Sequence, residues 1–307
     1  MSLTALGNFA ELGLRQPPQR IVSLVPSITE SIFDLGGGGR LVAVTDYCVH
    51  PADRVRPLPR VGGTKNPDLQ RVRAALPDLI IANQEENRRE DVEALRADGF
   101  KVWVTFPVTV AGTLEVLWAL VRGLDLPQSA PVVDALERVC EVAALAAENT
   151  PPVKVFCPIW REPGVEQSAT PRWWMTFNRA TYMHDLLRLC GAENVFADRP
   201  RRYPLAADLG EASAEPPTPE RDTRYPRVTP TEVAERAPDV IVLPDEPYLF
   251  ADADLAAFDA FPDIPACRDR RLFLCDGSLL TWPGTRLGRA LNELPGLFWA
   301  GGAERPA

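Results

Sequence analysis

The feature that most constrains the fold is an alternation of short apolar runs with capped helical segments. Four runs rich in valine, isoleucine and leucine have the length and composition of buried strands: residues 21–25, 41–45, 79–82 and 101–105. Segments of helical length lie between them. Strand and helix in alternation is the pattern of a parallel sheet with helices on its faces, so the chain is predicted to be an α/β protein.

Capping residues mark where the helices of the first half begin and end. Residues 27–30 (Ser-Ile-Thr-Glu) have the spacing of a capping box and predict a helix that ends at Gly36. Asn66 and Pro67 predict the cap and first residue of another helix. Residues 88–98 and 112–122 predict two more, each followed by a glycine.

One long helical segment interrupts this alternation. Residues 128–149 carry apolar side chains at helical spacing and have prolines at both ends. About 20 residues at a rise of 1.5 Å span roughly 30 Å, the width of a small lobe. We therefore predict an N-terminal α/β lobe at 1–126, a linking backbone helix at 127–150, and a C-terminal α/β lobe at 151–307.

The second half repeats the organisation of the first. Its predicted strands are 153–157, 240–243 and 271–275, and its predicted helices include 179–190 and 285–299. Residues 72–81 and 233–242 share the order helix, Pro-Asp turn and strand, and a second capping box occupies 229–232. This weak repeat favours two Rossmann-like lobes with central parallel sheets. Residues 199–228 contain six prolines and predict an irregular excursion from the second lobe.

Charge and hydropathy exclude several classes of function. The chain has 33 basic and 42 acidic residues, a net charge of −9, which is opposite in sign to a nucleic-acid-binding surface. No apolar stretch approaches the roughly 20 residues that span a bilayer. The first 20 residues lack the basic start and continuous apolar core of a secretion signal. The sequence as written therefore predicts a cytoplasmic protein, or a periplasmic or other extracytoplasmic one if a leader has been trimmed.

Histidines and cysteines offer little for a metal site. His50 and His184 are the only histidines, which excludes a three-histidine site, and no metal ligands are predicted. His184 lies inside a predicted helix and is expected to be a surface or interlobe residue. The six cysteines form no CxxC motif, and most lie in apolar runs, so reduced structural thiols are expected.

Catalytic motifs are absent apart from one weak pair. The sequence contains no GxSxG, HExxH or Walker-type loop. Cys48 and His50 follow a predicted strand two residues apart and could act as thiolate and imidazole. No third group can be assigned to orient the imidazole, so a buried Cys48 and a His50 at the rim of a cleft are favoured. A cytosolic enzyme that uses this pair remains the alternative class.

Candidate ligand contacts follow from the position of the strand ends. Ligands of open parallel sheets bind beyond the carboxyl ends of the strands. Trp160, Trp174 and Trp282 follow strands or lie in loops of the second half, whereas Trp103 is placed like a core residue. Loop tryptophans predict a broad apolar face that receives a flat or bulky ligand between the lobes. The alternative is that these rings pack the seam between the lobes.

Several segments together resemble a known family. They are residues 20–30 (RIVSLVPSITE), 42–47 (VAVTDY), 67–79 and 190–196 (CGAENVF). With the two lobes and one long helix, they resemble the helical-backbone substrate-binding proteins of iron-siderophore, haem and cobalamin importers, and the cobalamin-binding branch most of all. The resemblance covers about residues 19–299. It implies a non-enzymatic binder of a small-molecule metal chelate with no cofactor of its own.

The resemblance also assigns cleft positions. Tyr47 falls at a cleft tyrosine of the cobalamin-binding branch, and Tyr225 falls where that branch has a cleft tryptophan. Pro26, Trp160 and residues 276–286 fall at further cleft positions. Strand ends and resemblance together give the predicted ligand-binding set: Pro26, Ser27, Tyr47, His50, Asn83, Phe106, Trp160, Trp174, Tyr225, Tyr248 and Trp282.

The leading hypothesis is therefore a corrinoid such as cobalamin, with haem or a ferric siderophore as alternatives. Haem would require an axial ligand, for which Tyr47 or His50 would serve. An anionic ferric siderophore would require converging arginines, and the candidates are Arg161, Arg172 and Arg286.

An ABC permease is the partner that the resemblance implies. The family's docking glutamates lie early in the two repeat helices, where this chain has Gln70 and Thr231, with Glu232 adjacent. Either the protein docks differently, or it binds its ligand without delivering it to a permease. A monomer is expected.

Overall fold

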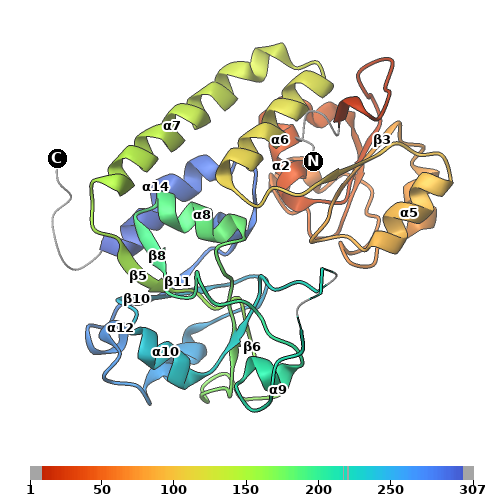
Figure 1. Cartoon of the computed structure of the whole chain (residues 1–307). Helices are drawn as coiled ribbons and strands as arrows, with labels where there is room; N and C mark the ends of the chain where they lie inside the picture. The colour runs from red at the N-terminus through yellow and green to blue at the C-terminus, as the bar shows by residue number, and fades with distance from the viewer. Residues whose placement is uncertain (1–8, 217, 220, 300–307) are drawn as a thin grey trace. The chain divides into compact units, whose positions relative to one another are not determined.

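The structure is a computed structural model that describes residues 9–216, 218–219 and 221–299 (Figure 1). The chain forms two compact units, the first made of residues up to Val139 together with Trp282–Gly288. The second unit contains Cys140–Thr281 and the residues from Arg289 onward. Each unit has a parallel sheet with helices, which confirms the predicted α/β class. None of the described helices is both long and apolar enough to cross a membrane.

The sheet of the first unit contains four parallel strands in the order β2-β1-β3-β4. They are β1 (Ile21–Ser23), β2 (Leu41–Val44), β3 (Leu79–Asn83) and β4 (Val102–Thr105). Each predicted strand of this half is therefore present. Strand β3 is buried along its whole length, as expected for a strand covered on both faces.

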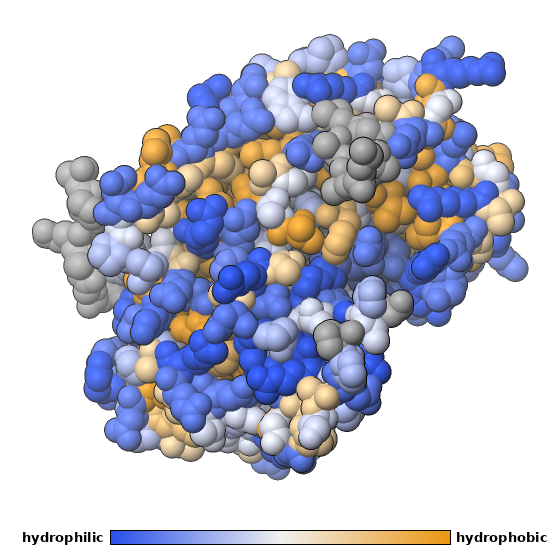
Figure 2. All heavy atoms as spheres, viewed as in Figure 1, coloured by the Kyte–Doolittle hydropathy of each residue, from blue (hydrophilic) through white to orange (hydrophobic). Residues whose placement is uncertain are grey.

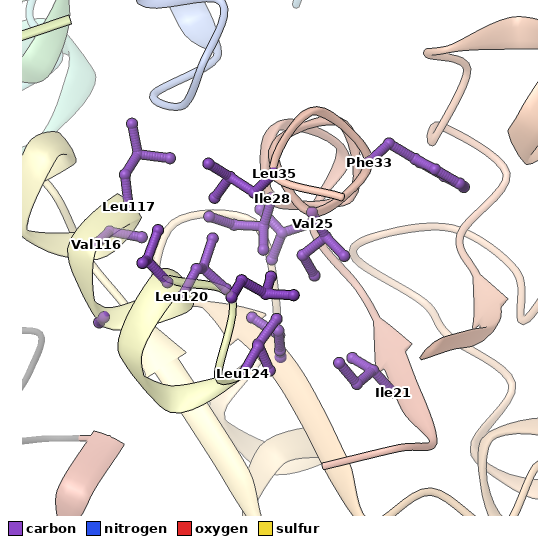
Figure 3. Close-up of a cluster of buried hydrophobic side chains, with 14 of the residues drawn as sticks. Ile21, Val25, Ile28, Phe33, Leu35, Val116, Leu117, Leu120 and Leu124 are labelled. Carbon is purple, nitrogen blue, oxygen red and sulfur yellow. The ribbon is translucent and has the colours of Figure 1, made fainter. Parts of the chain in front are cut away.

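Helices cover both faces of this sheet. On one face, α2 (Pro26–Asp34) and α6 (Val110–Gly123) share a buried cluster with strand residues such as Ile21 and Ile81 (Figure 3). On the other face, neighbouring strand residues such as Val22 and Ile80 cluster with α4 (Leu69–Ala74) and α5 (Arg89–Ala97). The two-residue period of a strand thus divides its side chains between two cores.

Two predicted helix starts in the first unit are wrong. Helix α2 begins at Pro26 with Val25 as its cap residue, and no side chain caps it, so Ser27 does not form a capping box. The ring of Pro26 fixes φ near the helical value and begins the helix before Ser27. Helix α4 is capped by Asp68, whose carboxylate accepts from two backbone N–H groups, instead of by Asn66.

The long helix is present as α7 (Ala130–Glu148). Val133 and Leu136 are buried, but Val139, Val142 and Leu145 are 45%, 66% and 60% exposed. In Figure 2, apolar residues lie among polar ones along this helix. The predicted apolar stripe is therefore buried only in part.

The second unit has its own parallel sheet, in the order β11-β10-β5-β8. Its strands are β5 (Val153–Phe156), β8 (Ala192–Asn194), β10 (Val240–Pro244) and β11 (Leu272–Cys275). Figure 1 shows α8 (Tyr182–Leu189) and α14 (Leu287–Trp299) on one side of this sheet. On the other side lie α10 (Pro230–Arg236) and α12 (Pro265–Arg268).

One helix start in the second unit is confirmed. Thr229 accepts from the backbone N–H of Glu232, and the Glu232 carboxylate accepts from the backbone N–H of Thr229. This is the predicted capping box of α10.

The excursion at 199–228 is held by a buried ion pair. Arg199 is 4% exposed, and its Nη1 lies 3.0 Å from Oδ1 of Asp208, which is fully buried. Nε of Arg199 lies 3.0 Å from Glu232 of α10. The excursion is thereby attached to the helix that follows it.

Candidate functional site

A small antiparallel sheet that the sequence did not predict organises the candidate site of the second unit. It contains β6 (Trp160–Arg161), β7 (Trp174–Met175) and β9 (Arg227–Val228). Residues directly opposite each other in such a sheet point to the same face. The register therefore separates Trp160, Met175 and Arg227 from Arg161, Trp174 and Val228.

These two faces differ in burial. Arg161, Trp174 and Val228 are at most 1% exposed, whereas Trp160 is 39% exposed. Backbone hydrogen bonds continue the pairing of β7 with β9 beyond the strands, since Thr176 and Asn178 donate to Pro226 and Arg224. Tyr225 lies in a bend just before β9 and is partly exposed. We call the surface formed by Trp160, Met175 and Arg227 the outward face.

Trp160 extends the outward face toward a second aromatic pair. Its ring centroid lies 5.5 Å from that of Tyr248, at an interplanar angle of 72°. Tyr248 in turn lies 4.7 Å from Phe250. Edge-to-face packing of this kind holds an exposed ring in one orientation, so Trp160 presents a fixed apolar surface.

Trp174 belongs to the core of the second unit. Its ring is stacked on Phe258, with centroids 4.9 Å apart and an angle of 6° between the planes. The sequence placed Trp174 in a loop, but it occupies a two-residue strand whose alternation turns it inward. This ring is therefore not available to a ligand.

Two predicted contacts are exposed at the carboxyl end of the first unit's sheet. Tyr47 follows β2 and is 63% exposed, and Phe106 follows β4 and is 36% exposed. The Tyr47 ring lies against Gly63, where an added Cβ would be 3.4 Å from Cε2 of the tyrosine. Both rings offer apolar surface to solvent.

Three other predicted contacts at this end are buried. Pro26 and Ser27 lie in the first turn of α2, and the Ser27 hydroxyl has no hydrogen-bond partner among the described residues. Asn83 is 4% exposed; its Oδ1 accepts from the backbone N–H of Glu85 at 2.7 Å, and its Nδ2 donates to Thr105 Oγ1 at 3.3 Å. These bonds build the turn after β3, so Asn83 has a structural role here.

His50 and Trp282 lie together in the first unit. Their ring centroids are 5.7 Å apart, at an angle of 66°. The guanidinium carbon of Arg286 lies 4.9 Å from the Trp282 ring. Trp282 is 8% exposed and His50 is partly exposed, so His50 is the more accessible of the two.

Cys48 is a core residue. It is fully buried, and its Sγ lies 3.2 Å from the hydroxyls of Thr29 and Thr45. Burial raises the pKa of the Cys48 thiol. A protonated thiol without access to solvent cannot act as a nucleophile, which removes the basis for the Cys48–His50 pair.

The arginines proposed for an anionic siderophore have carboxylate partners. Buried Arg161 pairs with Asp254 at 2.5 Å and donates to three backbone carbonyls. Arg286 pairs with Glu30 at 2.6 Å. Exposed Arg172 lies 3.7 Å from Glu162.

Metal ligands and disulfides are not found in the part of the chain that the structure describes. No group of three or more His, Cys, Asp and Glu side chains in that part could hold a metal ion. All six cysteines are free thiols, and four of them are buried. Burial lowers the pKa of His184, which is half-buried in α8.

A surface groove of about 960 Å³ in the first unit follows β4, the edge strand. Its lining includes Phe106 and Gln84 from the strand ends, but most of it comes from residues 99–112. Tyr47 and His50 lie outside this lining. The groove therefore does not bring the predicted contacts of this unit together.

Comparison with known proteins finds a family model and relatives that resemble parts of this chain. The family model described as periplasmic binding protein matches residues 21–117. The vitamin B12-binding protein of Pectobacterium atrosepticum is 29% identical over 218 residues, which is 64% of this chain and 73% of that protein. Over these residues the chain is similar to periplasmic binding proteins. The vitamin B12-binding protein of Vibrio cholerae is 28% identical over 191 residues, or 61% of this chain and 64% of its own length.

Solved structures of periplasmic binding proteins share the whole fold. The periplasmic heme-binding protein RhuT from Roseiflexus sp. RS-1 matches with a TM-score of 0.72 and 23% identity, covering 92% of this chain and 98% of RhuT. The periplasmic vitamin B12 binding protein BtuF of Vibrio cholerae matches with a TM-score of 0.72 and 20% identity, covering 92% and 97%. At these identities the likeness concerns the fold.

Sequence reasoning missed part of the outward face. Met175 and Arg227 were not predicted as site residues, because each lies in a strand of only two residues. The signal that reveals them is the pairing register with Trp160. That register becomes visible only when segments 160–161, 174–175 and 227–228 are brought together.

Proposed function

We propose that this protein binds a flat, bulky metal chelate of the corrinoid class, with Trp160 as its main aromatic anchor. The observation that carries the proposal is the exposure of the Trp160 ring, 39%, on a strand whose neighbouring residue, Arg161, is 1% exposed. Apolar surface covered by a ligand contributes roughly 25 cal/mol per Å². The names of the relatives, vitamin B12-binding proteins, support the corrinoid class.

In this proposal, Tyr47 and Phe106 of the first unit also contact the ligand. Both rings are exposed and both directly follow strands of the parallel sheet. We include His50, whose ring is held edge-on against Trp282, among the ligand contacts of this unit. Tyr225 and Tyr248 complete the set in the second unit.

Haem is the second candidate ligand, and a specific observation favours it. Tyr47 is 63% exposed, so its phenol oxygen is accessible as an axial ligand to iron. The name of RhuT as a heme-binding protein agrees with this alternative. A ferric siderophore has less support, because Arg161 and Arg286 are already paired with carboxylates.

Titration calorimetry with cyanocobalamin, hemin and ferrichrome tests the proposal directly. We expect heat of binding with cyanocobalamin and little with ferrichrome. Binding of hemin but not of cyanocobalamin would support the second candidate and reject the first. No binding of either would refute the proposed function.

The buried state of Cys48 argues against the enzymatic alternative. Cys48→Ala should bind cyanocobalamin as tightly as the wild type, because the thiol only fills core volume beside Thr29 and Thr45. A loss of ligand binding or turnover in a variant that remains folded would restore a chemical role for this thiol.

We also propose that the protein serves an ABC permease without using Glu232 for docking. Gln70 and Thr231 are both exposed, but the Glu232 carboxylate is held by Arg199 and by the cap of α10. Glu232→Gln should therefore lower thermal stability and leave permease binding unchanged. Lost permease binding at unchanged stability would contradict this.

A further inference from the structure

Two arginines of the second unit, Arg201 and Arg227, form no ion pair with a carboxylate in the part of the chain that the structure describes. Arg227 stands on the outward face, in register with Met175 and Trp160. The backbone N–H groups of Arg227 and of Arg202, the neighbour of Arg201, both donate to the carboxylate of Asp208, which brings the two segments together. Burial, followed by the charge of Arg201, lowers the pKa of Arg227, and the charge of Asp208 opposes this shift. Two adjacent positive charges destabilise each other unless an anion compensates them.

The other charges of the excursion are largely neutralised inside it. The described ion pairs are Arg199 with Asp208 and Glu232, Arg221 with Glu215, and Arg224 with Asp222. Asp208 accepts the backbone N–H of Arg227 at 2.8 Å, and its ion pair is with Arg199. Among the described residues, no carboxylate forms an ion pair with the side chain of Arg201 or Arg227.

Both guanidinium groups also have buried N–H groups that donate to nothing. These are Nε and Nη1 of Arg227 and Nε of Arg201. Arg227 is the only side chain in the described part of the chain with two such atoms. A buried donor without an acceptor destabilises the fold, and charged donors do so most. Three unused donors on two adjacent cations are the complement of an oxyanion, which offers several acceptor oxygens.

Aromatic rings hold both guanidinium groups in place. The central carbon of Arg227 lies 5.3 Å from the ring centroid of Trp173, and that of Arg201 lies 4.4 Å from the ring of Tyr203. Tyr203 is itself fixed, because its hydroxyl donates to the carbonyl of Asp222 at 2.8 Å. An arginine stacked on a ring keeps its N–H edge free for a planar, bidentate contact.

We propose that Arg227 and Arg201 form an oxyanion-binding site that receives a phosphate or carboxylate group of the ligand whose ring system covers Trp160. The identity of that ligand rests on the proposed function. Cobalamin carries a phosphodiester in its nucleotide loop, and haem carries two propionates, so either candidate supplies the required anion.

Matched ligand pairs test the site. Cyanocobalamin is compared with dicyanocobinamide, which lacks the phosphodiester and its nucleotide, and hemin is compared with hemin dimethyl ester. For the ligand that the protein binds, we expect Arg227→Gln to weaken binding of the member that carries the anionic group, cyanocobalamin or hemin, about tenfold to a hundredfold. Binding of the member without that group, dicyanocobinamide or hemin dimethyl ester, should be nearly unchanged. Arg201→Gln should act in the same direction, and Arg227→Lys should restore part of the loss.

The control variant is Arg188→Gln, which removes the same charge from α8 of the same unit, where Arg188 pairs with Asp185. It should leave both pairs unaffected. If Arg227→Gln and Arg201→Gln weaken charged and neutral members equally, or weaken neither, the oxyanion site is refuted while the proposed function stands. Circular dichroism of each variant separates lost binding from lost folding.

Inorganic phosphate separates failure of this site from failure of the proposed function. The wild type could bind neither corrinoid nor haem. In that case the arginines are still tested by comparing the melting temperature in phosphate with that in chloride at equal ionic strength. A phosphate-dependent rise in melting temperature that Arg227→Gln abolishes supports the anion site alone. No such rise overturns it.

Discussion

The two units present aromatic rings to solvent in different ways. In the first unit, Tyr47 and Phe106 directly follow strands of the parallel sheet, where ligands of α/β proteins bind. In the second unit, Trp160 stands on a separate antiparallel sheet whose strands have two residues each. In the first unit, exposed rings can therefore be predicted from where the strands end. In the second unit, the pairing register of the small sheet determines which ring is exposed.

The largest effect should come from exchanging the buried tryptophan of the small sheet. Trp174→Ala removes a ring that is 1% exposed and stacked on Phe258, and should lower the free energy of unfolding by about 3–5 kcal/mol. Trp160→Ala, on the opposite face of the same sheet, should cost far less. Urea denaturation measures both variants. Equal losses would show that both rings are core residues and that the outward face does not exist.

A second effect concerns binding instead of stability. Trp160→Ala should remove about 2–3 kcal/mol of ligand binding, because it deletes the proposed anchor. Tyr47→Ala, in the first unit, should remove less, since its 63% exposed ring is held by fewer neighbours. Calorimetry with cyanocobalamin measures both. If Trp160→Ala binds as tightly as the wild type, the second unit's rings do not contact the ligand.

Two helix starts, one in each unit, allow a smaller test of the same comparison. Thr229→Ala removes a capping hydroxyl and should cost about 1 kcal/mol of stability. Ser27→Ala, at the start of α2, should cost close to nothing, because the Ser27 hydroxyl makes no hydrogen bond. Chemical denaturation measures the stability of both variants. A larger loss for Ser27→Ala than for Thr229→Ala would contradict this difference.

The smallest effect should be a pH dependence that originates in α8. Burial lowers the folded-state pKa of His184 below its usual 6.5, so the unfolded chain binds the proton more tightly. Stability from this group is therefore complete above about pH 6.5 and is lost as the pH falls toward the folded pKa. His184→Gln should flatten the fall in melting temperature between pH 7.5 and pH 5. An unchanged profile would assign the dependence to other groups.

Much of the fold could be predicted because its strands and helices have regular periods. The strands of the first sheet and helix α7 appear close to their predicted bounds, since long apolar runs and proline boundaries are local signals. The start of α4 could not be predicted as well. Asn66 and Asp68 are both suitable caps, and only Asp68 has its carboxylate against free N–H groups.

The candidate site was less predictable. Tyr47, Phe106 and Trp160 are exposed where the sequence placed ligand contacts, but Trp174 and Asn83 are buried. Amino-acid type alone does not separate these groups, because an aromatic or amide side chain can serve a core, a turn or a ligand. Trp160 and Trp174 differ because the pairing of β6 with β7 puts their side chains on opposite faces of the small sheet.

The sequence by itself determined the α/β alternation, the long helix and the capping box at Thr229, since each depends on residues that are close along the chain. Only the tertiary structure decided which tryptophan points outward and which arginines keep unused donors. Arg161 meets Asp254 across 93 positions of sequence, and Arg227 joins the outward face through strand pairing. Such partners are set by the packing of distant segments, and no local pattern encodes them.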